Sequence, residues 1–236
     1  MTDEGPPESQ HPLLVTTAWL ADRLEGEDFA LIDCGDPTAY RRAHIPGAVS
    51  PSRHPFLNRA DGPQLVVGGE EFEQLARQLG VSSATPVVLY DDNASLHAAR
   101  LWWVFELYGH TNVRILDGGF NAWINEGWPL TMEAPQPQPG SFTARVDDSH
   151  LCRLDVLKTT VEDGGAVQIW DTRSDAEWSG ENDRGNRRAG HVPGAKHLEW
   201  SRLMEGPPTR RFRPLREIRE LLLDAGINPE AETVSY

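Results

Sequence analysis

The stretch HIPGA at positions 44–48 has a near copy, HVPGA, at positions 191–195, and this pair reveals how the chain is organised. Before each copy, an Asp at a predicted strand end is followed by an aromatic residue: Asp33 and Tyr40 in the first case, Asp171 and Trp178 in the second. The second copy differs by nine extra residues between its aromatic residue and its His. Two stretches with the same landmarks in the same order indicate an internal duplication.

Two later landmarks extend the duplication. LGV at 79–81 matches AGI at 225–227, and VVLY at 87–90 matches TVSY at 233–236. Repeats of this length are whole globular domains rather than units of a solenoid. We therefore expect a disordered tail over residues 1–12, a first domain over 13–130, a Pro-rich linker over 131–141 and a second domain over 142–236.

The secondary-structure pattern predicts an α/β fold. Short apolar runs at 29–33, 87–90, 113–116, 166–171 and 233–236 are typical of buried strands. Amphipathic or capped stretches between them predict helices at 37–43, 70–79, 94–107, 154–161 and 215–224. This alternation implies a mostly parallel sheet with helices on both faces in each domain.

Composition limits the class of partner. The formal charge of −14 argues against nucleic acid or an anionic membrane as the main partner. Between Arg173 and Arg219, however, eleven Lys or Arg face seven Asp or Glu. This stretch is either a solvated surface of mixed charge or a field that attracts a small anion.

The cysteines and the N-terminal stretch indicate the cellular compartment in which the protein is expected. Two cysteines, Cys34 and Cys152, do not make a disulfide framework, and His/Cys clusters with metal-ligand spacing are lacking. The polar N-terminal stretch is not a signal peptide, and no apolar run is long enough to span a membrane. We expect a cytoplasmic protein without a cofactor or metal.

The motif and its setting resemble the rhodanese family. Tyr40 followed by HIPGA resembles that family's signature, and LDGGFNAW at 116–123 resembles the segment that closes each of its domains. Tandem copies joined by a Pro-rich linker are typical of its thiosulfate and 3-mercaptopyruvate sulfurtransferases. The resemblance implies a small anionic sulfur donor, a thiol or cyanide-like acceptor, and sulfur carried as a persulfide.

The resemblance places the nucleophile directly after the central strand of a domain. Backbone N–H groups of the following loop and a helix N-terminus there form an anion site that lowers a thiol pKa. The first repeat has Asp91 at this position, so we expect it to be silent. In the second repeat the position falls immediately after Tyr236, and we expect residues 1–236 alone to be inactive.

Three explanations of the end at Tyr236 stay open: a fragment, a break of the chain at the loop, or a UGA codon meant as selenocysteine. In the first repeat, about 40 residues follow the strand that matches 233–236. We therefore expect the second domain to lack a helix, a strand and a last helix, and to expose a strand edge.

The expected substrate-binding residues all lie in the second repeat. Arg173 matches the family's strand-end Arg that faces the donor's oxyanion, where the first repeat has Gly35. Arg184, Arg187 and Arg188 lie in the nine-residue insertion, either at the rim of the site or as solvated charges. Trp200 either walls the site or packs in the core.

The remaining polar residues of the motif have structural explanations. We expect the strand-end carboxylates to bind nearby backbone N–H groups and the motif histidines to fix the Pro-Gly turn by a ring hydrogen bond. We expect Cys34 not to carry sulfur, because it is offset from the nucleophile position. For Cys152 we expect a buried, inert thiol.

Two other functions compete with sulfur transfer. One is a non-catalytic rhodanese-like module that binds anions or partners. The other is a phosphatase resembling the cell-cycle dual-specificity enzymes, which the tandem arrangement disfavours. The cationic stretch favours thiosulfate over 3-mercaptopyruvate as donor, whereas the sequence does not identify the physiological acceptor.

Overall fold

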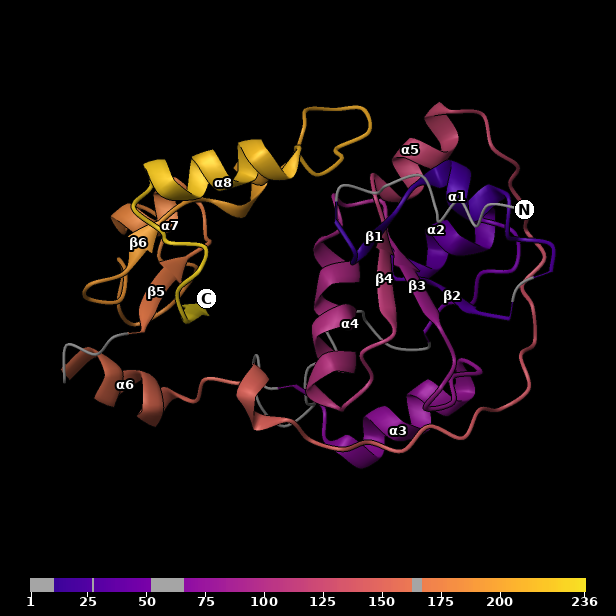
Figure 1. Cartoon of the computed structure of the whole chain (residues 1–236), viewed down its shortest axis with the longest axis horizontal. Helices are drawn as coiled ribbons and strands as arrows, with labels where there is room; N and C mark the ends of the chain where they lie inside the picture. Colours follow the sequence, from indigo (N-terminus) through magenta and orange to yellow (C-terminus); the bar gives the residue numbers. More distant parts are fainter. Residues whose placement is uncertain (1–10, 27, 52–65, 163–166) are drawn as a thin grey trace, which may run out of the picture. The chain divides into compact units, whose positions relative to one another are not determined.

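The computed structural model describes residues 11–26, 28–51, 66–162 and 167–236. By its contacts the chain divides into unit 1, Met1–Leu151 with Gly206–Arg211, and unit 2, Cys152–Glu205 with Phe212–Tyr236. Each unit contains one parallel sheet (Figure 1). The expected tail lies outside the described residues except for His11 and Pro12.

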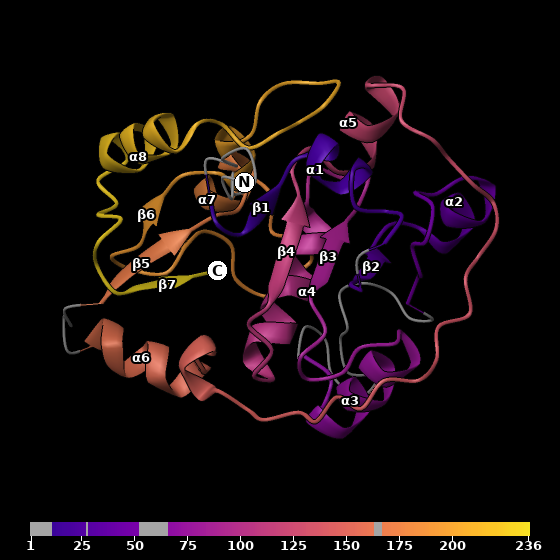
Figure 2. The same cartoon turned by 45° about the vertical axis from the view of Figure 1, so that its right-hand side comes forward.

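Unit 1 has a four-stranded sheet in the order β1-β4-β3-β2, and every pair is parallel (Figure 2). Its strands are β1 (Leu14–Val15), β2 (Ala30–Asp33), β3 (Val87–Tyr90) and β4 (Val113–Leu116). The register pairs Asp33 with Tyr90, so the carboxyl ends of β2 and β3 lie side by side. Parallel strands need crossover connections, and helices supply them.

The helices of unit 1 cover both faces of this sheet. Ile32 and Leu89 face the cluster formed with α3 and α4, whereas Leu31 and Val88 face the cluster formed with α1, α2 and α5. These helices are α1 (Thr17–Ala21), α2 (Pro37–Arg42), α3 (Gly69–Gln78), α4 (Leu96–Leu107), α5 (Gly119–Asn125) and the short η1 (Asp148–His150). The predicted α/β architecture is confirmed for this unit.

Local capping explains where two of these helices begin. The Thr16 side chain accepts a hydrogen bond from Trp19 N and caps α1. Asp36 caps α2 by accepting from Thr38 N and Ala39 N, and Pro37 follows in the first turn, where a missing N–H costs nothing. The start of α2 at Pro37 agrees with the helix predicted at 37–43.

Unit 2 has a three-stranded parallel sheet in the order β6-β5-β7. Its elements are β5 (Gln168–Asp171), β6 (Lys196–His197), β7 (Thr233–Ser235), α6 (Leu154–Glu162), α7 (Asp175–Ser179), η2 (Trp200–Leu203) and α8 (Leu215–Asp224). The expected strand over 166–171 begins at Gln168 in the structure, and Ala166 lies outside the described residues. Each unit thus has a central pair of parallel strands, β2 and β3 in unit 1 and β5 and β7 in unit 2.

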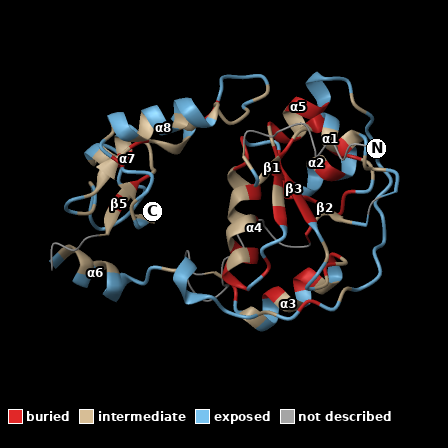
Figure 3. Cartoon of the chain, in the orientation of Figure 1, coloured by how far each residue is buried: buried red, intermediate tan, exposed pale blue. Residues whose placement is uncertain are grey.

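Burial differs between the two units (Figure 3). The sheet of unit 1 is buried on both faces, and Tyr90 of β3, Phe105 of α4 and Trp123 of α5 are among the fully buried side chains of the unit. In unit 2, α6 and α8 contain no buried residue. Four of their apolar side chains are exposed: Leu154, Val156, Leu215 and Leu223. Along the described part of the chain, no helix is both long and apolar enough for a membrane span.

The Pro-rich stretch 131–141 is anchored to unit 1. Thr131 forms an isolated antiparallel bridge with His44, and Gly140 N donates to Arg77 O at 2.8 Å. A Cβ on Gly140 would lie 2.0 Å from Val81 O, so the backbones meet there and glycine is required. Phe142 then enters the core of unit 1 at 1% exposure. By its contacts the chain divides at Leu151.

Replacing Phe142 by Ala tests this attachment. The loss of a buried aromatic side chain should lower the free energy of unfolding by about 3–5 kcal/mol. Urea unfolding followed by circular dichroism measures the effect. The control is Val146→Ala, at a position that is 60% exposed, which should stay within about 0.5 kcal/mol of the native chain. Equal losses in the two variants would show that Phe142 is not a core residue.

Candidate active site

A tyrosine joins the central strands to the motif turn in both units. Tyr90 Oη accepts a hydrogen bond from Ile45 N at 3.2 Å, and Tyr236 Oη accepts from Val192 N at 2.9 Å. Each hydroxyl also hydrogen-bonds the strand-end carboxylate, Asp33 or Asp171. The duplication seen in the sequence is therefore also a duplication of side-chain contacts.

The motif histidines fix the turn as predicted. His44 Nδ1 lies 2.8 Å from Tyr40 O and His191 Nδ1 lies 2.9 Å from Trp178 O, so each ring bonds to the backbone of the preceding aromatic residue. The rings also stack on that residue, with centroids 3.9 Å apart in the first pair and 3.4 Å apart in the second. These contacts occupy the rings in local structure.

The strand-end carboxylates bind the backbone N–H two residues further on, as predicted: Gly35 N for Asp33 at 2.8 Å and Arg173 N for Asp171 at 3.0 Å. Burial raises the pKa of Asp33 to about 6; the Gly35 N–H opposes this rise and the charge of Asp92 adds to it. Burial also acts on Asp171, but the hydrogen bonds from Arg173 outweigh it and hold the pKa of Asp171 below its usual value.

Arg173 lies at the carboxyl edge of the sheet in unit 2. Its guanidinium forms a two-pronged pair with the fully buried Asp171, through Nε to Oδ1 at 3.0 Å and Nη2 to Oδ2 at 2.5 Å. Nη2 also donates to Gly190 O at 3.0 Å, and the guanidinium carbon lies 5.0 Å from the centroid of the Tyr236 ring. The side chain stays 29% exposed, so an anion can reach it.

In unit 1, Asp91 occupies an anion site of its own. Its Oδ1 accepts from Asn93 N and Ser95 N at 2.8 and 2.9 Å, and its Oδ2 accepts from His97 N and Ala98 N at 2.7 and 2.8 Å. The side chain is buried, and four amides at the start of α4 converge on one carboxylate. The built-in carboxylate therefore takes the place of a bound anion.

The backbone around Asp91 is built for this approach. Ala94 and Ser95 adopt the left-handed conformation, at φ +54° and +63°, which turns the loop so that its amides face inward. Phe120 N donates to Asp91 O at 2.8 Å, and a Cβ on Gly119 would lie 2.2 Å from that oxygen. The GG pair at 118–119 thus allows the chain to pass close behind the loop.

The two thiols differ in their surroundings, and Cys34 lies beside the Asp91 loop, since its backbone N–H donates to Tyr90 O at 2.7 Å. Cys34 is fully buried, and desolvation raises the pKa of its thiol well above the usual value. Cys152 is exposed, so the expectation of a buried thiol is wrong. It lies in the segment between η1 and α6, outside any helix or strand.

The insertion arginines differ in their contacts. Arg184 Nε lies 3.1 Å from Oε1 of Glu177, whose side chain is 9% exposed and also forms a capping box with Ser174 at the start of α7. Arg187 and Arg188 are exposed. Within the described residues neither forms a hydrogen bond or an ion pair. The insertion is therefore anchored by Arg184 and presents two free cations.

Trp200 begins η2 and donates its backbone N–H to Thr172 O at 3.0 Å, beside the strand end. His197, which the sequence analysis did not single out, bonds to Arg173 O through Nε2 at 2.9 Å. The available sequence signal was its place two residues after HVPGA, where the first repeat has Ser50.

Among the described residues no group of His, Cys, Asp or Glu is arranged to hold a metal ion.

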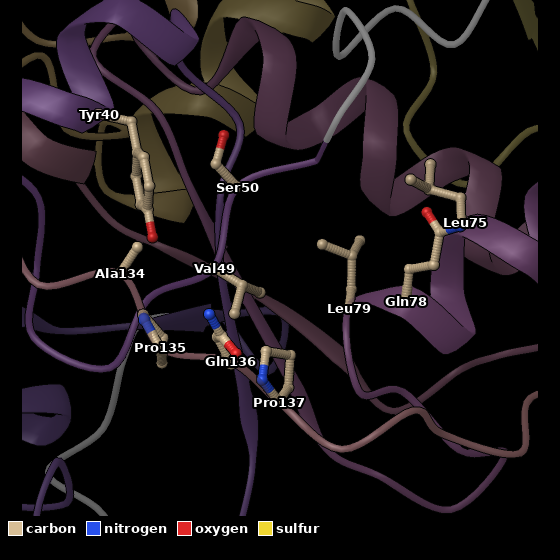
Figure 4. Close-up of a pocket in the computed structure, with 10 residues that line it drawn as sticks. All are labelled: Tyr40, Val49, Ser50, Leu75, Gln78, Leu79, Ala134, Pro135, Gln136 and Pro137. Atoms are coloured by element: carbon tan, nitrogen blue, oxygen red, sulfur yellow. The ribbon is translucent and has the colours of Figure 1, made fainter.

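A hollow of about 400 Å³ lies in unit 1 between the motif turn, α3 and the Pro-rich stretch (Figure 4). Its lining includes Tyr40, Val49, Leu79 and Pro137. All ten lining side chains are uncharged, so this hollow has no cation to hold a thiosulfate-like anion. The cationic edge of unit 2 is the better candidate.

Comparison with known proteins identifies the family of this chain. The model of the rhodanese-like domain matches residues 16–126. The sulfur carrier protein TtuD of Thermus thermophilus is 34% identical over 240 residues, covering 96% of this chain and 82% of that protein. A thiosulfate sulfurtransferase of Pseudomonas aeruginosa is 32% identical, covering 97% of this chain and 83% of its own length. The chain belongs to the rhodanese family.

The fold also resembles that of a solved structure of the rhodanese type. The crystal structure of SseA from Escherichia coli, described as a 3-mercaptopyruvate sulfotransferase with the rhodanese fold, superimposes with a TM-score of 0.83. The match covers 94% of this chain and 87% of that one at 24% identity. Both units are thus those of a rhodanese fold.

Asp33→Asn should stabilise the chain at neutral pH. Because the folded pKa is raised from 3.8 to about 6, ionisation lowers stability as pH rises through this window, by about 3 kcal/mol in total. Asn keeps an oxygen for Gly35 N and carries no charge. Urea unfolding at pH 4 and pH 7 should show a gain at pH 7 alone; equal stability at pH 7 would contradict the cost assigned to Asp33.

Asp91→Asn should strongly destabilise unit 1. The amide NH₂ replaces one acceptor oxygen and faces backbone donors that are left unpaired, at a cost of about 3 kcal/mol or more. The matched control is Asp92→Asn at the exposed neighbour, which should change stability by less than about 0.5 kcal/mol. Thermal unfolding measures both. A small effect at Asp91 would mean that the four amide bonds are not a net source of stability.

Proposed function

We propose that this protein is a sulfurtransferase, moving a sulfane sulfur from thiosulfate or 3-mercaptopyruvate to a thiol or cyanide-like acceptor. The observation that carries the proposal is the position of Arg173, which is paired with Asp171 and lies against Tyr236 at the carboxyl edge of β5 and β7. The similarity to a sulfur carrier protein and to a thiosulfate sulfurtransferase supports it.

The proposed nucleophile is a thiol or selenol on the residue that follows Tyr236 in the natural protein. Tyr236 and Tyr90 make the same hydrogen bond to the motif turn, and Asp91 follows Tyr90. The amide cradle around Asp91 shows what such a loop offers an anion at that position. A loop of this kind in unit 2 would lower the pKa of the nucleophile and hold its persulfide.

In the proposed reaction the thiolate attacks the outer sulfur of thiosulfate. The sulfur–sulfur bond of the donor breaks, sulfite leaves with the electron pair, and a persulfide anion forms on the enzyme. Cyanide or a thiolate then takes the outer sulfur and restores the nucleophile. Arg173 binds the donor's oxyanion, because its planar guanidinium can bond two oxygens while Asp171 holds it in place.

The other residues have supporting roles in this proposal. Arg187, Arg188 and Trp200 contribute to the donor or acceptor side of the site, and Arg184 anchors the insertion through Glu177. Unit 1 is silent because a carboxylate does not carry sulfur. A cytoplasmic location stays a prediction. A non-catalytic rhodanese-like module is the alternative, and it requires a residue other than Cys or selenocysteine after Tyr236.

The experiment measures thiocyanate formed from thiosulfate and cyanide by the protein as its gene encodes it. We expect turnover, and Arg173→Lys should raise KM for thiosulfate about tenfold or more through loss of the two-pronged contact. The control Arg216→Lys, at an exposed helix pair, should leave KM unchanged. A polypeptide of residues 1–236 should form no thiocyanate. Turnover by that polypeptide would implicate Cys34 or Cys152 and overturn the site.

A further inference from the structure

His197 makes a directed contact with the backbone of Arg173. It ends β6, its side chain is 13% exposed, and its Nε2 lies 2.9 Å from Arg173 O. A carbonyl oxygen can only accept a hydrogen bond, so Nε2 carries the hydrogen. The ring is therefore a donor to the residue that presents the cationic group of the site.

Two further contacts set the orientation of this ring. It stacks on Trp178 with centroids 4.9 Å apart and planes 8° from parallel, and Trp178 also stacks on the motif residue His191. Its Nδ1 lies 3.6 Å from Oδ1 of Asp175, which itself pairs with Arg202 at 2.7 Å. Since Nδ1 faces a carboxylate and one face lies on an indole, Nε2 is aimed at Arg173 O.

Arg173 is thus fixed at both of its ends. Its guanidinium is held by Asp171 and Gly190 O, but these bonds leave its own carbonyl unconstrained. That carbonyl precedes Ser174, the N-cap of α7, and His197 is its partner. We propose that His197 is a positioning residue for Arg173 and thereby sets the affinity of the site for an anionic sulfur donor. The inference rests on the proposed function of Arg173.

The first repeat supports the pairing of these two roles. Counted from the motif histidine, the position of His197 corresponds to Ser50. Counted from the strand-end Asp, the position of Arg173 corresponds to Gly35. Ser50 Oγ is buried and has no hydrogen-bond partner within the described residues. Unit 2 therefore has both the donor His197 and the arginine Arg173, whereas unit 1 has Ser50 and Gly35 at these positions.

The test compares His197→Phe with His197→Gln in the protein as its gene encodes it. Phe keeps a ring on Trp178 and loses the donor, whereas Gln keeps a donor at the Nε2 position and loses the ring. We expect Phe to raise KM for thiosulfate about 3- to 10-fold, with kcat within about twofold, and Gln to restore a KM near the native value. Ser50→Ala is the matched control and should change neither constant.

Packing alone predicts the opposite order, with Phe near native and Gln impaired, and that result would overturn the inference. Thiosulfate affinity by titration calorimetry gives a readout that needs no turnover. If the protein binds thiosulfate without forming thiocyanate and Phe weakens the binding, the proposed function fails and the role of His197 stands. An unchanged affinity in the Phe variant overturns the role of His197, and a native protein that binds no thiosulfate overturns both.

Discussion

A carboxylate buried at the carboxyl end of a parallel strand must have its charge balanced, and the rest of each unit depends on how this is done. In unit 2, Arg173 balances the charge of Asp171 while its side chain stays 29% exposed at the edge of the sheet. In unit 1, Gly35 leaves Asp33 with one backbone N–H and a tyrosine hydroxyl, and its pKa rises. One position, Arg173 or Gly35, thus decides whether the strand-end carboxylate has a charged partner.

In the loop after the central strand of unit 1, the backbone donors are also satisfied by a side chain of the same unit. Four backbone amides converge on Asp91, an arrangement suited to any anion of the right size. The carboxylate satisfies these donors without a ligand, so the loop and α4 keep their structure on their own. The core around Tyr90 and Phe105 is well packed beside this loop.

The sequence was sufficient for the elements whose signals are local. The alternating strands and helices, the helix that begins at Pro37 and the turn held by His44 follow from neighbouring residues, and the structure has them. Contacts between residues distant in the chain carried no such signal. Phe142 reaches the core of unit 1 from beyond a Pro-rich stretch. Cys152 is exposed, although cysteine is a residue type that is usually buried. His197 was missed because its importance depends on a backbone oxygen 24 residues away.

The carboxylate of Asp91 is tethered to the chain that binds it, so it acts as a ligand at a local concentration no free solute can match. Because the four amides already have a partner, sulfate, phosphate or sulfite in the surrounding solution has to compete with a tethered carboxylate for the cradle of unit 1.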